Sequence, residues 1–259
     1  MPEEHGNFVF DFKGKNAVVT GGASGIGKAA ALLLGSLGAK VAIWDMQESL
    51  GKEVCAELEA FNGGLFFETD VTLEMQVTEN ARSVEKQWGR IDILICAAGV
   101  TYPYATVLES DLAGWERTIN INSRGVFFCN RAVAPLMIKH SWGKIVNIAS
   151  IAAKTGGGIL GNAIYGASKG AVISFTKGLA RELAPYGINV NSICPGVTET
   201  PILGPMTGNS REILREATPL GCFAEVSDIS NAIAFLCSEG ARHITSIALN
   251  VDGGFMSGN

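Results

Sequence analysis

Short apolar segments alternate with helical segments along most of the chain, and this alternation limits the possible folds more than any other feature. Buried parallel strands appear in a sequence as near-continuous apolar runs, and strands that alternate with helical segments indicate βαβ units. The sequence therefore predicts an α/β fold, a doubly wound domain with a seven-stranded parallel sheet and helices on both faces. The expected strands are residues 16–20, 40–44, 65–68, 91–96, 144–148, 189–193 and 248–251.

The segments between these strands have helical periodicity. In the fifth of them, Val172, Phe175, Leu179 and Leu183 recur at intervals of three and four residues, which makes one apolar stripe. Such a stripe needs a partner surface. The expected helices are residues 26–37, 48–61, 73–88, 111–139, 163–185 and 227–238.

Nothing in the composition divides the chain into two domains. No Pro-rich, Ser-rich or charged linker interrupts the alternation, so residues 1–259 are expected to form a single domain with 1–12 as an N-terminal extension. Two Gly- or Pro-rich segments, 151–162 and 197–220, follow the carboxyl ends of strands, where ligands of open α/β sheets bind. We expect 197–220 to form a lid over the substrate.

The charge pattern argues against several classes of partner. The net charge is −5 and the 20 basic residues are spread along the chain, so no nucleic-acid partner is expected. The 6 cysteines and 3 histidines lack the spacing of metal ligands, and no metal is expected. No apolar run is long enough to span a membrane, and the first residues lack the features of a secretory signal. We expect a cytoplasmic protein with free thiols.

A glycine-rich turn follows the first strand and precedes the first helix. Gly21, Gly25 and Gly27 give the spacing GxxxGxG, with Ser24 and Ile26 among them. Glycines let the backbone approach a pyrophosphate, and the helix N-terminus offers unpaired N–H groups to it. A tight turn without a ligand would use the same glycines, but the strand before and the helix after favour dinucleotide binding.

The end of the second strand indicates which dinucleotide binds. Asp45 can accept hydrogen bonds from the adenosine ribose, and its charge would repel a 2′-phosphate. Lys15 and Lys28 could attract that phosphate, yet Met46 and Gln47 follow the aspartate where an Arg would be needed. The sequence therefore favours NAD over NADP, while an ordinary strand-end turn is the alternative role for Asp45.

Tyr165 and Lys169 lie one helical turn apart, on one face at the start of the fifth helix. A phenol has a pKa of about 10, and an ammonium about 4 Å away would stabilise its anion by roughly 4 kcal/mol. Tyr165 is therefore the expected acid and base, which takes a proton from an alcohol while hydride passes to NAD. Taken alone, a YxxxK pair is more often a surface pair than a catalytic one.

Two further polar residues support the catalytic interpretation. Ser150 follows the fifth strand and can donate a hydrogen bond to the substrate oxygen as charge develops there. Asn122 lies in the long helical segment, where its amide could hold a water behind Lys169. Asn120 is an alternative on the same stretch, and either asparagine could simply be a polar residue that bends the helix.

These motifs, in this order, resemble the short-chain dehydrogenase/reductase family over residues 12–254. The resemblance implies a single Rossmann-type domain with a catalytic set of Ser150, Tyr165, Lys169 and Asn122. The cofactor contacts that the motifs and the resemblance imply are Gly21, Ser24, Gly25, Ile26, Gly27, Asp45, Asp70, Val71, Ala97, Ala98, Gly99, Tyr165, Lys169, Pro195, Gly196, Thr198 and Thr200.

The resemblance also implies how parts of the cofactor are held. It places Asp70 and Val71 against the adenine and Thr198 and Thr200 at the nicotinamide carboxamide. It further implies a homotetramer assembled through the two long helices, which would cover the apolar stripe.

The chain departs from the family's pattern at two places. Cys96 stands where the family usually has Asn, so a hydrogen bond that braces the strand end is in question, while the fold and the chemistry should survive. The segment 150–165 is longer than usual and contains Gly156, Gly157 and Gly158, which lengthens the wall of the expected substrate pocket.

The expected pocket combines apolar residues with hydroxyl and amide groups. Asn162, Thr155 and the tyrosines could bind hydroxyls, so a sugar, a polyol or another small secondary alcohol is the expected substrate. A bulkier steroid or cyclic ketone stays open. The residues expected to line the pocket are 151–164, Tyr102, Tyr104, Ile202, Leu203 and Met206.

Two other functions are compatible with this sequence. One is an NADP-dependent carbonyl or 3-oxoacyl reductase on the same fold. The other is a dinucleotide-binding regulator without turnover, against which the complete set of Ser150, Tyr165 and Lys169 argues, because a sensor needs no proton donor.

Overall fold

The computed structural model of the chain describes residues 10–102, 106–157, 162–203 and 209–257. Its centre is a seven-stranded sheet in the order β3-β2-β1-β4-β5-β6-β7, with every neighbouring pair parallel. The fold class predicted from the sequence is confirmed. The strands are β1 (Asn16–Thr20), β2 (Lys40–Asp45), β3 (Gly64–Glu68), β4 (Ile93–Cys96), β5 (Gly143–Ile148), β6 (Ile188–Pro195) and β7 (Ala248–Val251).

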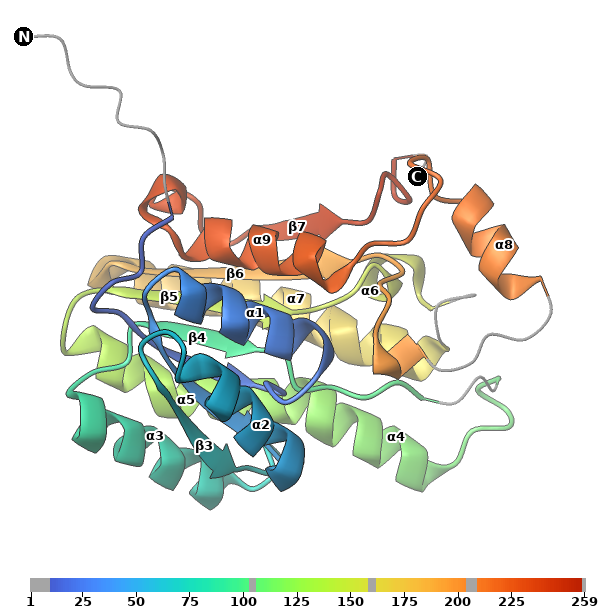
Figure 1. Cartoon of the computed structure of the whole chain (residues 1–259). Helices are drawn as coiled ribbons and strands as arrows, with labels where there is room; N and C mark the ends of the chain where they lie inside the picture. The colour runs from blue at the N-terminus through green and yellow to red at the C-terminus, as the bar shows by residue number, and fades with distance from the viewer. Residues whose placement is uncertain (1–9, 103–105, 158–161, 204–208, 258–259) are drawn as a thin grey trace, which may run out of the picture.

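Helices cover both faces of this sheet (Figure 1). One face carries α1 (Gly25–Ser36), α2 (Glu48–Leu58) and α9 (Val226–Cys237). The other carries α3 (Glu74–Trp88), α5 (Gly125–Ile138) and α7 (Ala163–Leu183). The end where the strands finish, at the right of Figure 1, carries α4 (Leu112–Ile119), α6 (Ala152–Thr155) and α8 (Ser210–Glu216).

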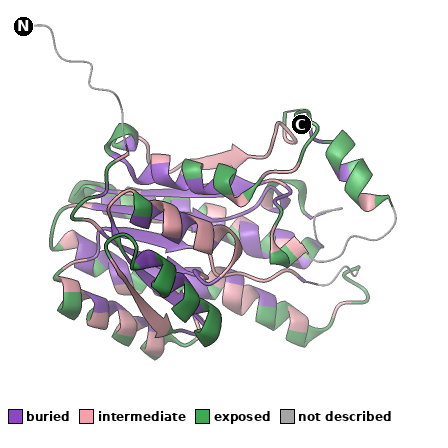
Figure 2. Cartoon of the chain, in the orientation of Figure 1, coloured by how far each residue is buried: buried purple, intermediate pink, exposed green. Residues whose placement is uncertain are grey.

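The strands are apolar along their whole length because each contributes side chains to two cores. In β1, Val18 packs into the core beneath α3, α5 and α7, whereas Ala17 and Val19 pack into the core beneath α1, α2 and α9. Figure 2 shows buried residues (purple) along the sheet and exposed residues (green) on the outward sides of the helices. The sequence pattern thus follows from burial on both faces.

The long helix expected at 111–139 is interrupted. It consists of α4, a π-helical turn at Asn120–Arg124 and α5. The turn occurs where the side chain of Asn122 is buried and hydrogen-bonds other segments, a tertiary contact that periodicity does not report. Short helices also occur in the two segments predicted to be irregular, α6 within 151–162 and α8 within 197–220.

The chain covers part of the apolar stripe of α7 by itself. Val172 and Leu183 are buried in the core. Phe175 and Leu179 are partly buried, and the ring of Phe175 packs edge-on against Phe127 of α5, with 6.0 Å between centroids. The expectation that the whole stripe needs a partner is therefore wrong for its buried half.

The strand order reverses between β1 and β4, which pair although they lie far apart in the sequence. At such a reversal the connections leave to opposite faces, and a crevice opens at the carboxyl ends of the strands. Here the segments after the two strands meet, because Ala97 N donates to the carbonyl oxygen of Thr20 (3.2 Å) and Ala98 N donates to Thr20 Oγ1 (3.2 Å). The glycine-rich turn therefore lies beside residues 97–99.

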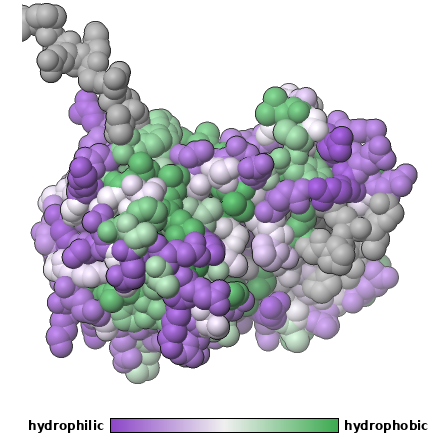
Figure 3. Space-filling view, viewed as in Figure 1, coloured by the Kyte–Doolittle hydropathy of each residue, from purple (hydrophilic) through white to green (hydrophobic). Residues whose placement is uncertain are grey.

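The described residues show four further features. No helix within the described residues is long and apolar enough to cross a membrane. On the face seen in Figure 3, apolar residues (green) show in separate patches among hydrophilic ones (purple). All six cysteines are free, and the described part of the chain holds no group of three or more His, Cys, Asp or Glu placed to bind a metal ion.

Candidate active site

The glycine-rich turn leaves no room for a Cβ at Gly21 or at Gly27. A Cβ on Gly21 would lie 2.7 Å from the backbone of Ala98, and its φ of +65° is one that glycine tolerates best. A Cβ on Gly27 would collide with the carbonyl oxygen of Gly21. At these two positions the turn therefore brings backbone atoms alone to the crevice beyond β1 and β4.

The helix α1 begins in this turn without a side-chain cap. Ser24 is the N-cap residue, and its side chain makes no capping hydrogen bond. Gly25 and Ile26 follow as the first helical residues. The N–H groups of this first turn have no acceptor inside the helix. The positive end of the helix dipole also favours an anion there. This uncapped terminus, walled by glycines, fits the pyrophosphate of a dinucleotide.

Asp45 ends β2 and is buried beside the glycine-rich turn. Its Oδ2 accepts a hydrogen bond from Ala23 N (3.0 Å), and its Oδ1 accepts one from Gln47 N (2.9 Å). A carboxylate oxygen can accept more than one hydrogen bond. Asp45 can therefore brace the turn and still accept from a ribose hydroxyl.

The two lysines that could attract a 2′-phosphate are engaged elsewhere. Lys28 Nζ pairs with Glu57 (2.7 Å between Nζ and Oε1). Lys15 precedes β1, at the opposite end of the sheet, and its Nζ lies 3.7 Å from the centre of the Trp142 ring. Neither side chain has Asp45 as its partner.

Asp70 and Val71 follow β3 in a segment that is fixed by local contacts. Asp70 Oδ1 accepts from Thr72 N (2.8 Å), and Asp70 N donates to Gln76 Oε1 (2.7 Å). Val71 is buried against the start of α5, where a Cβ on Gly125 would lie 2.7 Å from its Cγ2. The segment is thereby held at the carboxyl end of β3.

The segment after β6 closes on the glycine-rich turn from the other side. Pro195 ends the strand, and Thr198 Oγ1 donates to the carbonyl oxygen of Gly196 (3.1 Å). Thr200 Oγ1 donates to the carbonyl oxygen of Thr198 (3.2 Å), and its methyl carbon would lie 3.5 Å from a Cβ on Gly25. Elements distant in the sequence thus converge where the resemblance places the nicotinamide.

Lys169 is almost fully buried, with 4% of its surface exposed. Its Nζ donates to the carbonyl oxygen of Ile148 at the end of β5 (2.9 Å), and it would lie 3.3 Å from a Cβ on Gly99. Burial lowers the pKa of Lys169 to about 8, while the neighbouring thiols of Cys194 and Cys96 oppose that shift. The site therefore holds an ammonium that has lost much of its solvation.

Tyr165 and Ser150 lie together near this ammonium. The Nζ of Lys169 is 6.0 Å from the centre of the phenol ring. Burial raises the pKa of Tyr165, and a hydrogen bond with Ser150 opposes that shift. The ammonium is expected to lower the pKa of the phenol, but in the protein alone the cost of burying the anion outweighs that effect.

Asn122 is fully buried in the π-helical turn. Its Oδ1 accepts from Val100 N (2.8 Å), and its Nδ2 donates to the carbonyl oxygen of Val100 (2.8 Å) and to Ser168 Oγ (3.0 Å). Both amide hydrogens are used, so the side chain joins the segment after β4 to α7 and offers no donor to a water. Its Oδ1 would lie 3.3 Å from a Cβ on Gly99, whereas Asn120, the alternative on this stretch, is only partly buried.

Cys96 ends β4 beneath the site, where the family usually has Asn. Asn130 Nδ2 donates to Cys96 Sγ (3.5 Å), and the thiol also hydrogen-bonds Cys129. Burial raises the pKa of Cys96 well above its ordinary value. The strand end is therefore braced by a neutral thiol through weak hydrogen bonds.

Several residues expected to line the substrate pocket have other roles. Ile151 is fully buried in the core. Tyr102 is buried, and its Oη accepts from Asp111 N at the start of α4 (3.1 Å). Thr155 Oγ1 donates to the carbonyl oxygen of Gly157 (3.2 Å). Ile202 and Leu203 lie in a short 3-10 helix, Pro201–Leu203, while Tyr104, Met206 and Gly158 fall outside the described residues.

Two positions near Tyr165 have roles that the sequence reasoning missed. Asn162 is the N-cap of α7, and its Oδ1 accepts from Tyr165 N (3.1 Å). An Asn before a helix is a known capping signal and could have revealed this role. Ser168 hydrogen-bonds Asn122, and no local signal could have revealed it, because its partner belongs to another helical segment.

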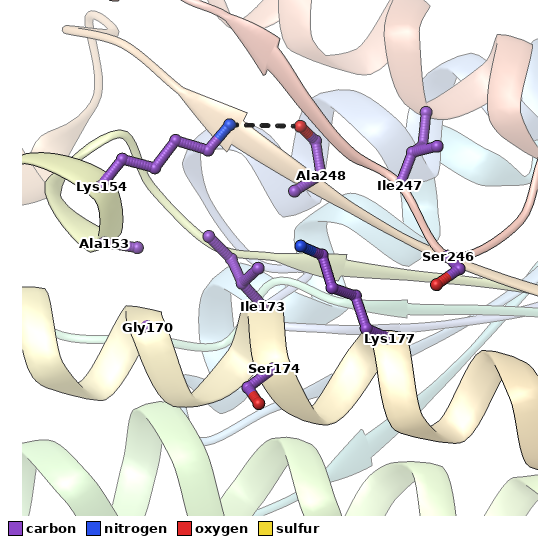
Figure 4. Close-up of a pocket in the computed structure, with 9 residues that line it drawn as sticks. All are labelled: Ala153, Lys154, Gly170, Ile173, Ser174, Lys177, Ser246, Ile247 and Ala248. Carbon is purple, nitrogen blue, oxygen red and sulfur yellow. Dashed lines mark hydrogen bonds between the residues drawn. The ribbon is translucent and has the colours of Figure 1, made fainter. Parts of the chain in front are cut away.

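A groove of about 560 Å³ lies between α7 and β7 (Figure 4). Lys154 Nζ donates to the carbonyl oxygen of Ala248 (3.3 Å) across one end, and Lys177 extends from α7 toward the sheet. The groove contains Ala153 and Lys154 from the expected pocket segment 151–164 but none of the predicted catalytic or cofactor-binding residues, so we place the candidate active site at the crevice. The groove is lined by Ala153, Lys154, Gly170, Ile173, Ser174, Lys177, Ser246, Ile247 and Ala248.

Known proteins resemble this chain over nearly its whole length. Residues 21–256 match the family model described as Enoyl-(Acyl carrier protein) reductase. The 2-dehydro-3-deoxy-L-rhamnonate dehydrogenase (NAD(+)) of Sphingomonas sp. (strain SKA58) is 35% identical over 247 residues, which cover 95% of this chain and 97% of that protein. A 3-oxoacyl-acyl-carrier-protein reductase of Thermotoga maritima is 36% identical over 248 residues, which cover 94% and 98%. The structure of a short-chain type dehydrogenase/reductase from Mycobacterium ulcerans has a TM-score of 0.91 and 30% identity, and the match covers 95% of this chain and 91% of that one.

Proposed function

The chain belongs to the short-chain dehydrogenase/reductase family of oxidoreductases, and we propose that it is an NAD-dependent dehydrogenase of small secondary alcohols. The observation that carries the proposal is the placement of Ser150, Tyr165 and Lys169 together at the carboxyl ends of the strands. The relative from Sphingomonas is named as a dehydrogenase that uses NAD(+). The uncapped, glycine-walled start of α1 fits such a cofactor at the same edge of the sheet.

In this proposal Tyr165 is the acid and base, and Ser150 orients the substrate. The two side chains hydrogen-bond one another, so an alcohol oxygen bound between them would meet both. Tyr165 takes the hydroxyl proton during oxidation and returns it during reduction. Ser150 donates to the oxygen as its charge develops. The oxidised dinucleotide supplies the hydride acceptor when it is bound.

Lys169 supplies the positive charge on this side of the crevice. Its ammonium is held by the carbonyl oxygen of Ile148, and a nearby cation favours the anionic form of a phenol. Burial raises the pKa of Tyr165, so the protein alone keeps the phenol protonated at neutral pH. We therefore expect oxidation to quicken toward alkaline pH and reduction to slow.

Three observations support NAD over NADP. Asp45 lies beside the glycine-rich turn, where its charge would repel a 2′-phosphate. Lys28 is paired with Glu57, and Lys15 lies at the other end of the sheet. The remaining contacts proposed for the adenosine are Asp70 and Val71, which are held after β3.

The substrate is proposed to be a compact secondary alcohol or its ketone. Asn162, Tyr102 and Thr155 were expected to bind hydroxyls of a sugar or polyol, but each has a hydrogen-bond partner within the chain. A hydroxyl or an amide that makes one hydrogen bond can still make others, so a sugar, a polyol or another small secondary alcohol stays compatible with this site. Closure of the proposed lid, residues 197–220, would exclude water from such a substrate.

We also propose that the single domain assembles into a homotetramer through α5 and α7. Phe127 is 37% exposed, and Phe128, Phe175 and Leu179 beside it are only partly buried. Such a patch on two adjacent helices is typical of a protein interface. Light scattering that shows a stable monomer would contradict this assembly. The free thiols suit a reducing compartment, and we propose the cytoplasm.

A screen of secondary alcohols with NAD and with NADP tests the proposed activity. The panel contains cyclic alcohols, polyols and sugar acids, and absorbance of the reduced nicotinamide reports turnover. Tyr165→Phe should lower kcat by about 10² to 10⁴-fold, the usual contribution of acid–base catalysis, while leaving NAD affinity in a fluorescence titration nearly unchanged. Tyr186→Phe is the matched control, because Tyr186 is exposed beyond the end of α7.

The same screen separates the other functions. Faster turnover with NADP would favour the reductase, and Asp45→Asn should weaken NAD binding and improve NADP binding if the carboxylate selects the cofactor. Dinucleotide binding without turnover on the whole panel would favour a regulator. Full activity of Tyr165→Phe would show that the phenol does not transfer the proton.

A further inference from the structure

Ser168 is a fully buried hydroxyl between the two main residues of the proposed reaction. It lies in the first turns of α7, just before Lys169, with no exposed surface. Its Oγ donates to the carbonyl oxygen of Tyr165 (2.7 Å) and accepts from Asn122 Nδ2 (3.0 Å). The hydroxyl therefore uses its donor within α7 and an acceptor toward the π-helical turn.

A second contact joins the same two elements. Ser123 Oγ donates to the carbonyl oxygen of Ser168 (2.9 Å). Two neighbouring residues of the π-helical turn thus bind Ser168: Asn122 binds its side chain, and Ser123 binds its backbone. Beyond the turn, the amide of Asn122 binds both backbone groups of Val100. A continuous hydrogen-bonded path runs from Val100 to the backbone of Tyr165.

The helix does not need this hydroxyl for its own stability. Alanine has the better helix propensity, and a serine hydroxyl inside a helix competes with the backbone. Burying a hydroxyl also costs free energy unless it is hydrogen-bonded. A serine at this position therefore makes physical sense through its partner, Asn122, whose second amide hydrogen would otherwise be buried without an acceptor.

We propose that Ser168 is a positioning residue, which locks the π-helical turn onto α7 and so fixes Tyr165 and Lys169 against the wall formed by Gly99 and Val100. This role rests on the proposed function. Two atoms show why the register matters: Asn122 Oδ1 and Lys169 Nζ would each lie 3.3 Å from a Cβ on Gly99. A shift of α7 relative to the turn would move the ammonium away from that wall and from Ile148.

Ser168→Ala removes the hydroxyl and keeps the backbone. The Asn122 amide then has a buried donor without an acceptor, which is costly, so we expect the π-helical turn to move. We expect kcat to fall by about tenfold while KM for the alcohol and the affinity for NAD change by less than about twofold, since 1.4 kcal/mol corresponds to a factor of ten. Ser174→Ala on the exposed side of the same helix is the matched control and should leave kcat unchanged.

A second measurement does not depend on turnover. The ionisation of Tyr165 is followed by ultraviolet absorbance, with the Tyr165→Phe form of each protein subtracted so that only this phenol is counted. The groups that face the phenol and its ammonium are Ser150 after β5, Cys96 on β4 and Cys194 on β6, and none of them is altered. In Ser168→Ala we expect the pKa of Tyr165 to change, because the hydrogen bond with Ser150 depends on the position of α7.

The outcomes separate the positioning role from a structural one and from the proposed function. A lower melting temperature with unchanged kcat and an unchanged pKa of Tyr165 in Ser168→Ala would overturn the proposal. If the wild type oxidises no alcohol, the proposed function fails, and the titration alone decides the role of Ser168. If Ser168→Ala does not fold, Ser123→Ala removes the neighbouring contact, and the same two shifts are expected at smaller size, with their absence counting against the role.

Discussion

The glycine-rich turn and the first turns of α7 both lie at the carboxyl ends of the strands, yet they are built in different ways. The turn offers backbone groups, and the absence of Cβ atoms at Gly21 and Gly27 lets segments meet. The start of α7 offers side chains, and Ser168 and Lys169 are buried polar groups with partners on other elements. We call the glycine-rich turn the cofactor side of the site and the first turns of α7 the reaction side. The cofactor side is thus fixed by backbone geometry, and the reaction side is fixed by buried polar contacts.

The difference has an energetic counterpart. Glycines in the turn satisfy the backbone geometry that the strand-to-helix connection requires. By contrast, Lys169 carries a charge into a site with little solvent, and burial lowers its pKa from 10.5 to about 8. Burying the ammonium on the reaction side therefore lowers the stability of the fold, whereas on the cofactor side the same glycines serve both folding and cofactor binding.

Adding one methyl group to the glycine-rich turn should have the largest effect. In Gly27→Ala the new Cβ meets the carbonyl oxygen of Gly21, a backbone atom that cannot move without the turn. We expect loss of detectable NAD binding and a fall in the free energy of unfolding of about 3 kcal/mol. Isothermal titration and urea unfolding measure the two effects.

Gly178→Ala is the control for that substitution, because Gly178 lies in α7 and a Cβ there would meet nothing within 4 Å. It should raise the free energy of unfolding by about 0.5 to 1 kcal/mol through helix propensity. Normal NAD binding by Gly27→Ala would show that the turn tolerates a side chain. Backbone geometry would then not be what fixes the cofactor side of the site.

Removing the buried charge should have opposite effects on activity and stability. Lys169→Met is expected to lower kcat by about a hundredfold or more. The free energy of unfolding at pH 7 should rise by about 2 kcal/mol, since the pKa shift is worth about 3 kcal/mol and the hydrogen bond to Ile148 about 1 kcal/mol.

The difference in free energy of unfolding between the wild type and Lys169→Met should depend on pH. With its folded pKa at about 8 and its ordinary value at 10.5, Lys169 binds fewer protons in the folded chain between those two values. Stability of the wild type relative to Lys169→Met therefore rises from about pH 8 to 10.5, and the advantage of the variant fades. Urea unfolding at several pH values measures it, and a variant less stable than the wild type at pH 7 would contradict the cost assigned to this charge.

The two sides also differ in how far the sequence predicts them. The fold class follows from the apolar runs of the strands, and the turn at Gly21 to Gly27 follows from spacing next to a strand and a helix, because both are local signals. The pair of Tyr165 and Lys169 is also local, since one helix carries both.

The contacts that hold the pair come from elsewhere in the chain. Asn122 meets Ser168 only after α5 and α7 pack on the same face, and the π-helical turn that allows this interrupts a helix that periodicity predicts to be continuous. The pKa of Tyr165 is raised by burial, which depends on the whole site. Side-chain contacts between distant segments are therefore what the sequence alone leaves undetermined.

A smaller effect is expected at the cap of α7. Asn162→Ala removes the acceptor for Tyr165 N and should lower the free energy of unfolding by about 1 kcal/mol. Because the cap holds the turn that carries the phenol, kcat should fall about fivefold, a loss of about 1 kcal/mol. Asp111→Ala removes the equivalent cap of α4, where Oδ1 accepts from Gly114 N (2.6 Å), and should cost similar stability with unchanged kcat. Equal kcat values in the two variants would show that the cap serves folding alone.

The smallest effect is expected outside both sides, in the proposed lid. The start of this segment is joined to Ala224, which follows its end, because Ala224 N donates to the carbonyl oxygen of Val197 (2.9 Å) and Glu199 N donates to that of Ala224 (3.0 Å). Within it, Glu199 and Arg211 form an exposed ion pair.

Glu199→Gln should change the free energy of unfolding by less than about 1 kcal/mol, as is usual for exposed pairs. If the pair holds α8 over the substrate, KM for the alcohol should rise about twofold to threefold while kcat and NAD affinity stay the same, because neither the phenol nor the glycine-rich turn is touched. Steady-state kinetics at low and high salt measure this, since salt screens the pair in the wild type and should reduce the difference. A change in NAD affinity instead would mean that α8 acts on the cofactor side, and the division of the site into two sides would have to be redrawn around Thr198 and Thr200.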